Sequence, residues 1–149
     1  ITIMTAVLQM GELSLVARLF DEFELRYFPS VPINFGNLKE PIKQFFLERI
    51  KNIADVEELL HHVPTGDDEM AHNIFFFKGV LPDDSRVNDV FALAIVKNFQ
   101  NIVTHIMRLY PSIIAFDMVM EKIKELEPIY GTCMVGILSH FWKEGSMSR

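Results

Sequence analysis

Two adjacent histidines, His61 and His62, follow two adjacent glutamates, Glu57 and Glu58, by four residues. This spacing puts each Glu–His pair on one helix face, and both side chains can ligate zinc. Neighbouring helical residues point about 100° apart, however, so the two histidines diverge, and the remaining ligands would have to fold back from the following turn. We therefore expect the histidines to end a helix, where imidazole interacts well with free carbonyls, and we predict no metal site.

The single cysteine, Cys133, lies seven residues before His140. On one helix this separation corresponds to a rise of about 10.5 Å, too long for the hydrogen bond between a nucleophile and its base. Cys133 also lies in an apolar run, where a buried and reduced thiol is expected. Because structural disulfides are rare inside cells, a lone reduced cysteine indicates an intracellular protein, cytoplasmic or nuclear.

Acidic clusters at residues 67–69 and 83–85 lie beside turns. A calcium loop needs more oxygen ligands at set spacing than either cluster supplies, whereas an Asp or Ser before a helix caps its free N–H groups. The sequence also lacks a Gly-rich phosphate loop, a Gly-x-Ser-x-Gly elbow and a His-Glu-x-x-His pair. We therefore predict no enzyme activity, no cofactor and no small-molecule substrate.

Half of the 149 residues are hydrophobic, with thirteen Phe and eight Met among them. This composition supports one buried core. We expect residues 1–144 to form a single all-helical domain, a fragment of a larger protein, and residues 145–149 to be a disordered tail or a remnant of cloning.

The charge pattern bears on the class of partner. The net charge is −6, and no three basic residues occur in a row, so the basic face of a nucleic-acid binder is missing. No uninterrupted apolar stretch reaches the ~20 residues of a membrane span, and the first residues lack the basic start of a signal peptide. We predict a protein partner or a homodimer, with no nucleic acid and no membrane insertion.

Apolar spacing of three and four residues predicts an all-α fold of about eight helices, stacked as antiparallel pairs. Prolines at 29, 64, 111 and 128 mark the expected helix ends, because proline lacks the N–H group that a helix interior needs. Phe35 is expected beneath the loop at 29–37, and Leu13, Val16 and Phe20 on the inner stripe of the helix at 12–28. The other well-marked helices are expected at 41–51, 54–62, 69–77, 83–97, 100–109, 113–126 and 130–143.

Three consecutive phenylalanines, Phe75, Phe76 and Phe77, follow Ile74. The run fits a buried helix or a strand, and helix is preferred because no second strand-like run could pair with it. Successive helical residues point in different directions, so at least one Phe should lie at the surface. It is then either part of a binding patch or covered by a loop.

The two end segments of the chain are also apolar. A stack of helical repeats needs polar outer faces on its end repeats, and the helices expected at 1–10 and 130–142 lack them. Another protein surface is expected to cover one or both ends. Together with the phenylalanines, this gives a set of candidate interaction residues: Phe75, Phe76, Phe77, Trp142, Ile3 and Leu8.

Residues 6–20 and 93–107 share one pattern at an offset of 87 residues. In each, an apolar helical run is followed by Gly11 or Asn98, and four residues later by Leu15-Val16 or Ile102-Val103. This pattern resembles an ankyrin-type helix pair, in which the reversal needs a residue that tolerates positive φ. The resemblance implies stacked helix pairs that bind another protein.

Looser matches place Val56 and Val135 in the same role as Val16 and Val103, with spacings of 40, 47 and 32 residues. A helical repeat and an irregular helical bundle both stay open. We expect a non-catalytic protein-interaction or self-association module. The alternatives are a regulatory or structural domain of a larger enzyme or viral protein, and a bundle whose hydrophobic groove binds a partner helix.

Overall fold

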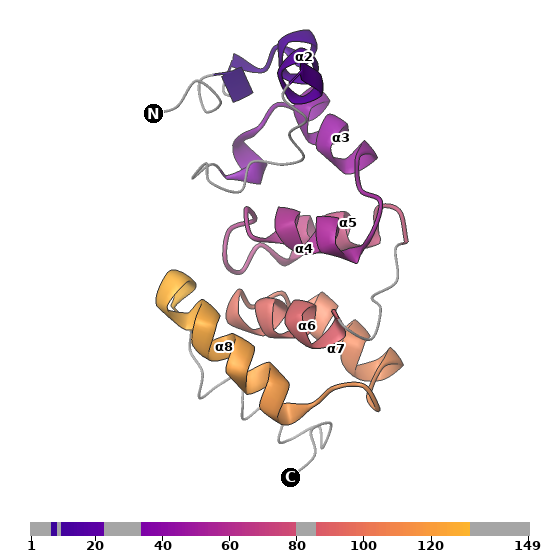
Figure 1. The fold of residues 1–149 in the computed structure, drawn as a ribbon, viewed down its shortest axis with the longest axis vertical. Coiled ribbons are helices and arrows are strands. Elements are labelled where there is room, and N and C mark those ends of the chain that lie inside the picture. The colour runs from indigo at the N-terminus through magenta and orange to yellow at the C-terminus, as the bar shows by residue number, and fades with distance from the viewer. Residues whose placement is uncertain (1–6, 9, 23–33, 80–85, 132–149) are drawn as a thin grey trace.

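The computed structural model describes residues 7–8, 10–22, 34–79 and 86–131, and the predicted all-α class is confirmed (Figure 1). These residues form seven α-helices and one short 3-10 helix, and no strand lies among them. In chain order the elements are α2 (Leu13–Glu22), η1 (Phe35–Asn37), α3 (Glu40–Glu48), α4 (Ile53–Leu60), α5 (Asp68–Phe76), α6 (Val87–Val96), α7 (Gln100–Leu109) and α8 (Phe116–Tyr130).

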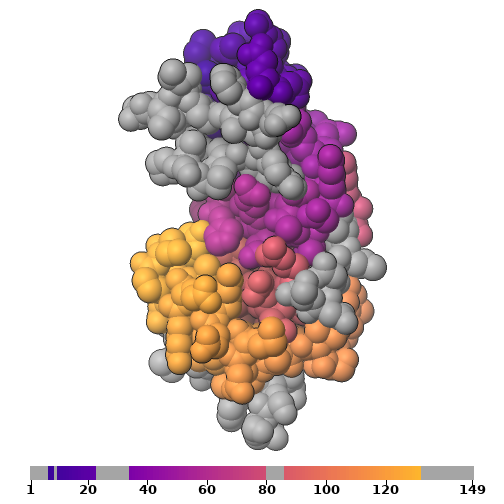
Figure 2. All heavy atoms as spheres, in the orientation of Figure 1, coloured from indigo at the N-terminus to yellow at the C-terminus, as the bar shows by residue number. Residues whose placement is uncertain are grey.

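The helices are arranged in layers along the long axis of the molecule (Figure 1). Helix α2 packs against α3, α4 against α5, and α6 against α7. Helix α5 also packs against α7, and α8 packs against α6, so that successive layers are joined. The elongated outline is visible in Figure 2, where α8 covers one side of the lower part.

Helix α6 is the centre of the lower core. Its residues are almost all apolar, and every one except Asp89 is buried. A helix that is apolar all round must be covered on all sides, and α7 and α8 provide that cover. Helix α7, by contrast, buries one stripe and exposes the other, so it forms part of the outer surface.

The two predicted reversals have the expected backbone. Asn98, between α6 and α7, has φ of +59°, and Gly11, before α2, has φ of +72°. Asn and Gly tolerate this left-handed conformation at little cost, as the repeated pattern required. At Gly11 there is a second constraint, because an added Cβ would lie 2.3 Å from Cδ of Lys39.

Lysines from later in the chain bind the free carbonyls at helix ends. Nζ of Lys39 donates to O of Met10 at 3.2 Å, and Nζ of Lys78 donates to O of Glu48, the last residue of α3, at 2.5 Å. The paired residues are 29 and 30 positions apart in the chain. A carbonyl at a helix C-terminus has no partner within its helix, so each lysine satisfies an orphan acceptor from an earlier part of the chain.

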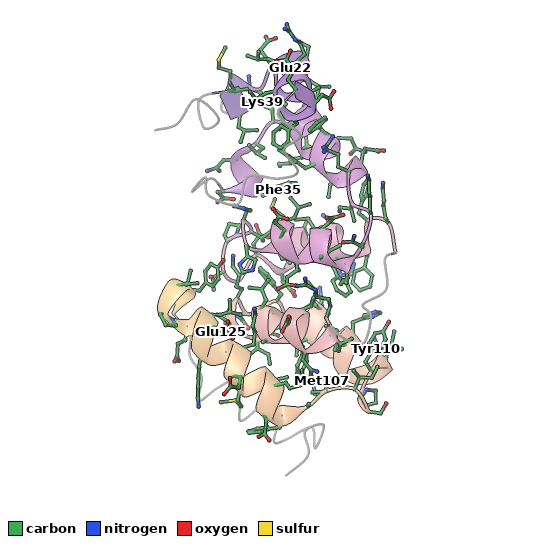
Figure 3. All side chains as sticks on the ribbon, viewed as in Figure 1. Glu22, Phe35, Lys39, Met107, Tyr110 and Glu125 are labelled. Atoms are coloured by element: carbon green, nitrogen blue, oxygen red, sulfur yellow. The ribbon has the colours of Figure 1, made fainter. Side chains whose placement is uncertain are left out.

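Several sequence-based details are confirmed by burial and capping. Phe35 is buried, as expected, and lies between the N-terminal helices and the α4–α5 layer (Figure 3). Asp67 caps α5 by accepting from N of Met70 at 3.2 Å. Val16 and Phe20 are buried on α2, but Leu13 is exposed. The ring contacts between α2 and α3 centre on Phe20, about 10 Å along the helix from Leu13.

The predicted helix end before Pro128 is wrong, because α8 continues through Pro128 to Tyr130 and ends at Gly131. Pro128 lies in the last turn and is exposed, as is Lys124 four residues earlier, so water can satisfy the carbonyl that loses its partner. The helix expected at 130–143 lies outside the described residues apart from Tyr130, the last residue of α8, and Gly131, its C-cap.

The looser match at Asp55-Val56 occupies a different position from Ile102-Val103. Helix α4 packs against α5, so Val56 is in the first helix of its pair, whereas Val103 is in the second. The link between α3 and α4 is not a tight reversal. Instead Asn52 caps α4, and the buried carboxylate of Asp55 accepts from N of Lys51 at 2.8 Å and N of Asn52 at 3.3 Å.

Candidate interaction surface

Helices α5 and α7 lie side by side and run in the same general direction. Near their N-termini, Oδ1 of Asp68 accepts from N of Asn101 at 3.1 Å. Farther along, the ring centroid of Phe76 is 4.8 Å from that of His105. Since both contacts follow the same order along the two helices, the outer sides of α5 and α7 form one continuous face.

Three rings form a row across this face. His72 and Phe76 are one turn apart on α5, with ring centroids 4.5 Å apart, and His105 of α7 meets Phe76 nearly edge to face, at an interplanar angle of 88°. Phe75 supports the row from the interior, 4.9 Å from Phe76 and 5.7 Å from His105. Because Phe75 is itself buried, with 2% of its surface exposed, the row stands on a packed base.

Apolar and charged residues follow the ring row along both helices. Phe77, which ends α5, has 39% of its surface exposed, and Leu109, one turn beyond His105, has 55% exposed. Arg108 is exposed in the last turn of α7. We call these six residues the α5–α7 face: His72, Phe76, Phe77, His105, Arg108 and Leu109.

None of the six residues of the α5–α7 face is acidic, although the chain carries twenty Asp and Glu residues, and the nearest exposed carboxylate on α5 is that of Glu69, one turn before His72. No Asp or Glu occurs between Glu69 and Asp83, or between Asp89 and Asp117. Arg108 forms no hydrogen bond or ion pair within the described part of the chain. Burial, then Arg108, then His72 lower the pKa of His105, which favours its neutral ring at neutral pH.

A second cluster of basic and aromatic residues lies in the interior, around Lys97 just after α6. Only 2% of the Lys97 surface is exposed. Its Nζ donates to O of Leu60 at 3.2 Å and to O of His61 at 2.8 Å, at the end of α4. The same Nζ lies 4.3 Å from the ring centroid of Tyr130, whose hydroxyl is hydrogen bonded to Nδ1 of His61.

Burial shifts every titrating group of this cluster toward its neutral form. It lowers the pKa of Lys97 to about 8, so Lys97 remains largely an ammonium at neutral pH. It lowers the pKa of His61 to about 4, with Lys97 as the next largest cause, so His61 is neutral. Burial also raises the pKa of Tyr130. A neutral imidazole can share a hydrogen bond with the Tyr130 hydroxyl without an unpaired charge.

The Lys97 cluster corrects the sequence-based role of His61. We expected the imidazole to interact with the carbonyls that end α4, but Lys97 does so from 36 and 37 residues away. Sequence reasoning missed Lys97, although a single lysine directly after the apolar run of α6 is an unusual place for a charge. Among the described residues, no three His, Cys, Asp or Glu side chains gather in a way that could hold a metal.

The structure distributes the predicted interaction residues unevenly. Phe77 is exposed and Phe76 is partly buried on the α5–α7 face. Phe75 and Leu8 are buried in the core, so neither is available at the surface. Ile3, Trp142, Cys133 and His140 lie outside the described residues, as does the acidic cluster at 83–85.

Comparison with known proteins gives no relative for this chain. No family model matches it, and neither a curated protein nor a solved structure does. Within the described ranges, no helix has the length and apolar character needed to cross a membrane.

Proposed function

We propose that this chain is a protein-interaction module that binds through the α5–α7 face. The observation that carries the proposal is the ring row of His72, Phe76 and His105, which is fixed from beneath by Phe75. Rigid aromatic side chains are the usual anchors of protein interfaces because they bury much area at little entropic cost. Leu109, one turn beyond His105, and Phe77, directly after Phe76, add exposed apolar surface that a partner could bury.

The arrangement of layers supports the ankyrin-type resemblance as part of this proposal. Asp68 and Asn101 have neighbouring positions in successive layers and are 33 residues apart, close to the ~33-residue ankyrin repeat. Arg86 of one layer pairs with Glu57 of the previous layer at 3.0 Å, 29 residues away. Nearest-layer contacts of this kind are typical of repeat proteins, which commonly use their extended surfaces for binding.

The test compares two variants that remove similarly exposed apolar side chains. Leu109→Ser changes the α5–α7 face, whereas Met118→Ser changes α8, where Met118 is 54% exposed. Partners are captured from the cells that express the protein and quantified for each variant, with circular dichroism to confirm folding. The proposal predicts that Leu109→Ser loses the partner and Met118→Ser keeps it. Equal capture by the two folded variants would overturn it.

Self-association through the same face is a specific form of the proposal. Size-exclusion chromatography with light scattering would then show a dimer for the wild type and for Met118→Ser, and a monomer for Leu109→Ser. A dimer that survives in Leu109→Ser would place the contact elsewhere.

A structural role within a larger protein is a second candidate. The observation in its favour is a separate group of exposed apolar residues at the α2 end, Met10, Leu13 and Leu15. Hydrogen exchange of the protein bound to its partner separates the two candidates. Protection confined to α2 would favour the structural role, and protection of α5 and α7 would favour the interaction module.

A further inference from the structure

We infer that the segment captured by the α5–α7 face is an acidic peptide that also carries apolar side chains. This inference rests on the proposed function, since it names the class of partner for the same face. The face was chosen for its aromatic and apolar residues, whereas the class of partner is inferred from the distribution of charge.

The charge distribution is complementary to an acidic partner. The chain has a net charge of −6, yet the stretches that contain the residues of the face, from Met70 to Gly79 and from Gln100 to Leu109, contain no acidic residue. Arg108 projects from this region without a hydrogen bond or ion pair in the described part of the chain. A carboxylate placed there would gain a guanidinium partner and would meet no nearby carboxylate from these two segments.

The ring nitrogens of the face offer further donors. His72 is exposed and His105 is partly buried, and the groups that act electrostatically on His105 are Arg108 of its own helix and His72 of α5. When no partner is bound, burial lowers the pKa of His105 and so favours its neutral ring. A carboxylate from the partner would favour the imidazolium, so binding is expected to take up protons.

Apolar surface makes a purely acidic partner a poor fit. Leu109 directly follows Arg108 on α7, and Phe77 adds exposed apolar surface at the end of α5, so burying them requires apolar side chains on the partner. An amphipathic acidic segment supplies both carboxylates and apolar side chains, whereas a uniformly charged segment would leave the apolar surface exposed to water.

Nucleic acid and anionic membranes are less suitable for this face. A nucleic-acid binder neutralises several phosphates, and each contact uses a Lys or Arg. Here the second cation at this end of the layer, Lys78, already donates to the backbone O of Glu48. Arg108 is the one guanidinium of this face, and it has no hydrogen bond or ion pair among the described residues; in a chain of net charge −6, a short peptide is the partner class that the face fits best.

The test uses three designed helical peptides of the same length, about four turns. The first combines Leu with Glu, the second combines Leu with Lys, and the third combines Ser with Glu. Binding to the full chain is measured by fluorescence anisotropy. We expect the Leu–Glu peptide to bind at least about tenfold more tightly than either of the others.

Two charge-reversal variants locate the binding. Arg108→Glu should weaken the Leu–Glu peptide by about tenfold or more, whereas Lys124→Glu, an equally large charge change at an exposed position of α8, should have little effect. Affinity of the wild type should rise as the pH falls from about 8 to about 6, because proton uptake by His105 accompanies binding.

The outcomes distinguish this inference from the proposed function. If the Leu–Lys peptide binds as well as the Leu–Glu peptide and Leu109→Ser abolishes both, the face is an interaction surface and the acidic partner class is wrong. If the two charge variants weaken binding equally, the attraction is general and the inference fails. Tighter binding to duplex DNA or to anionic vesicles than to the Leu–Glu peptide would also overturn it. If no peptide binds and Leu109→Ser keeps its cellular partner, both proposals fail.

Discussion

The molecule contains two clusters built from similar residue types, one in the interior and one on the surface. The interior cluster combines Lys97, His61 and Tyr130, and its polar atoms are bound to one another or to the end of α4. The surface cluster combines histidines with Phe76 and Arg108, and Arg108 has no bonded partner among the described residues. The two clusters therefore differ in whether their polar groups already have hydrogen-bond partners within the described part of the protein.

The difference has an energetic basis. A buried ammonium without partners would cost several kcal/mol, so Lys97 can be buried only because two carbonyls and an aromatic ring surround it. An exposed guanidinium is hydrated, and a carboxylate of a partner can replace that water when the partner binds. Perturbed pKa values alone would have singled out the interior cluster, where a substrate has no access to Nζ of Lys97.

The largest expected effect separates two neighbouring phenylalanines. Phe75→Ala removes a buried ring beneath the surface cluster and should lower the free energy of unfolding by about 3–5 kcal/mol. Phe77→Ala, two residues along the chain, should change it by less than about 1 kcal/mol because Phe77 is exposed. Urea denaturation measures both. Similar losses in the two variants would show that Phe77 belongs to the core.

The next comparison removes two lysines that bind helix-terminal carbonyls. Lys97→Met removes one of two donors from each carbonyl, since O of Leu60 also accepts from N of Val63 and O of His61 also accepts from the Tyr130 hydroxyl. The loss of two hydrogen bonds from an ammonium should cost about 2 kcal/mol of stability, partly offset by the removal of a buried charge. Lys78→Met removes an exposed bond to O of Glu48, which water can replace, and should cost about 0.5 kcal/mol or less. If the two substitutions lower the free energy of unfolding equally, burial does not determine how much these lysines contribute to stability.

The smallest expected effect is the pH dependence of the interior cluster. The pKa of His61 is lowered to about 4, below its ordinary value, so between these two values the unfolded chain binds the proton and the folded chain does not. Stability should therefore fall on acidification from about pH 7 to about pH 4, by about 1–2 kcal/mol after allowance for solvent screening.

A matched variant isolates the contribution of His61. His61→Asn keeps a hydrogen-bonding group near the Tyr130 hydroxyl but does not titrate, so its stability should vary less with pH over the same range. Glu57 acts in the opposite direction, because burial raises the pKa of its carboxyl. If the stability of His61→Asn depends on pH as strongly as that of the wild type, the group responsible for this dependence is not His61.

Much of the fold could be predicted from local patterns. The bounds of α7 agree with the helix expected at 100–109, because its amphipathic period starts after the turn at Asn98 and ends before Pro111. The positive φ at Asn98 followed from its place between two apolar helical runs. Pro128 misled the same reasoning, since a proline in an exposed last turn does not end a helix.

The candidate site was only partly visible in the sequence. The run of three phenylalanines correctly predicted that one of them would reach the surface, and Phe77 does. The phenylalanine run alone could not show that Phe76 meets His105, which is 29 positions away, or that Phe75 lies beneath them. The contribution of Arg108 and Leu109 depends on α7 lying beside α5.

The sequence by itself determined the all-helical class, the turns and the buried stripe of most helices, because these depend on residues a few positions apart. Only the tertiary structure decided which helices are neighbours, and hence which side chains have partners. Lys97 and Arg108 are both single basic residues near a helix end in the sequence. One became a buried cap and the other an open cation because α4 and α8 cover the first, and no described element covers the second.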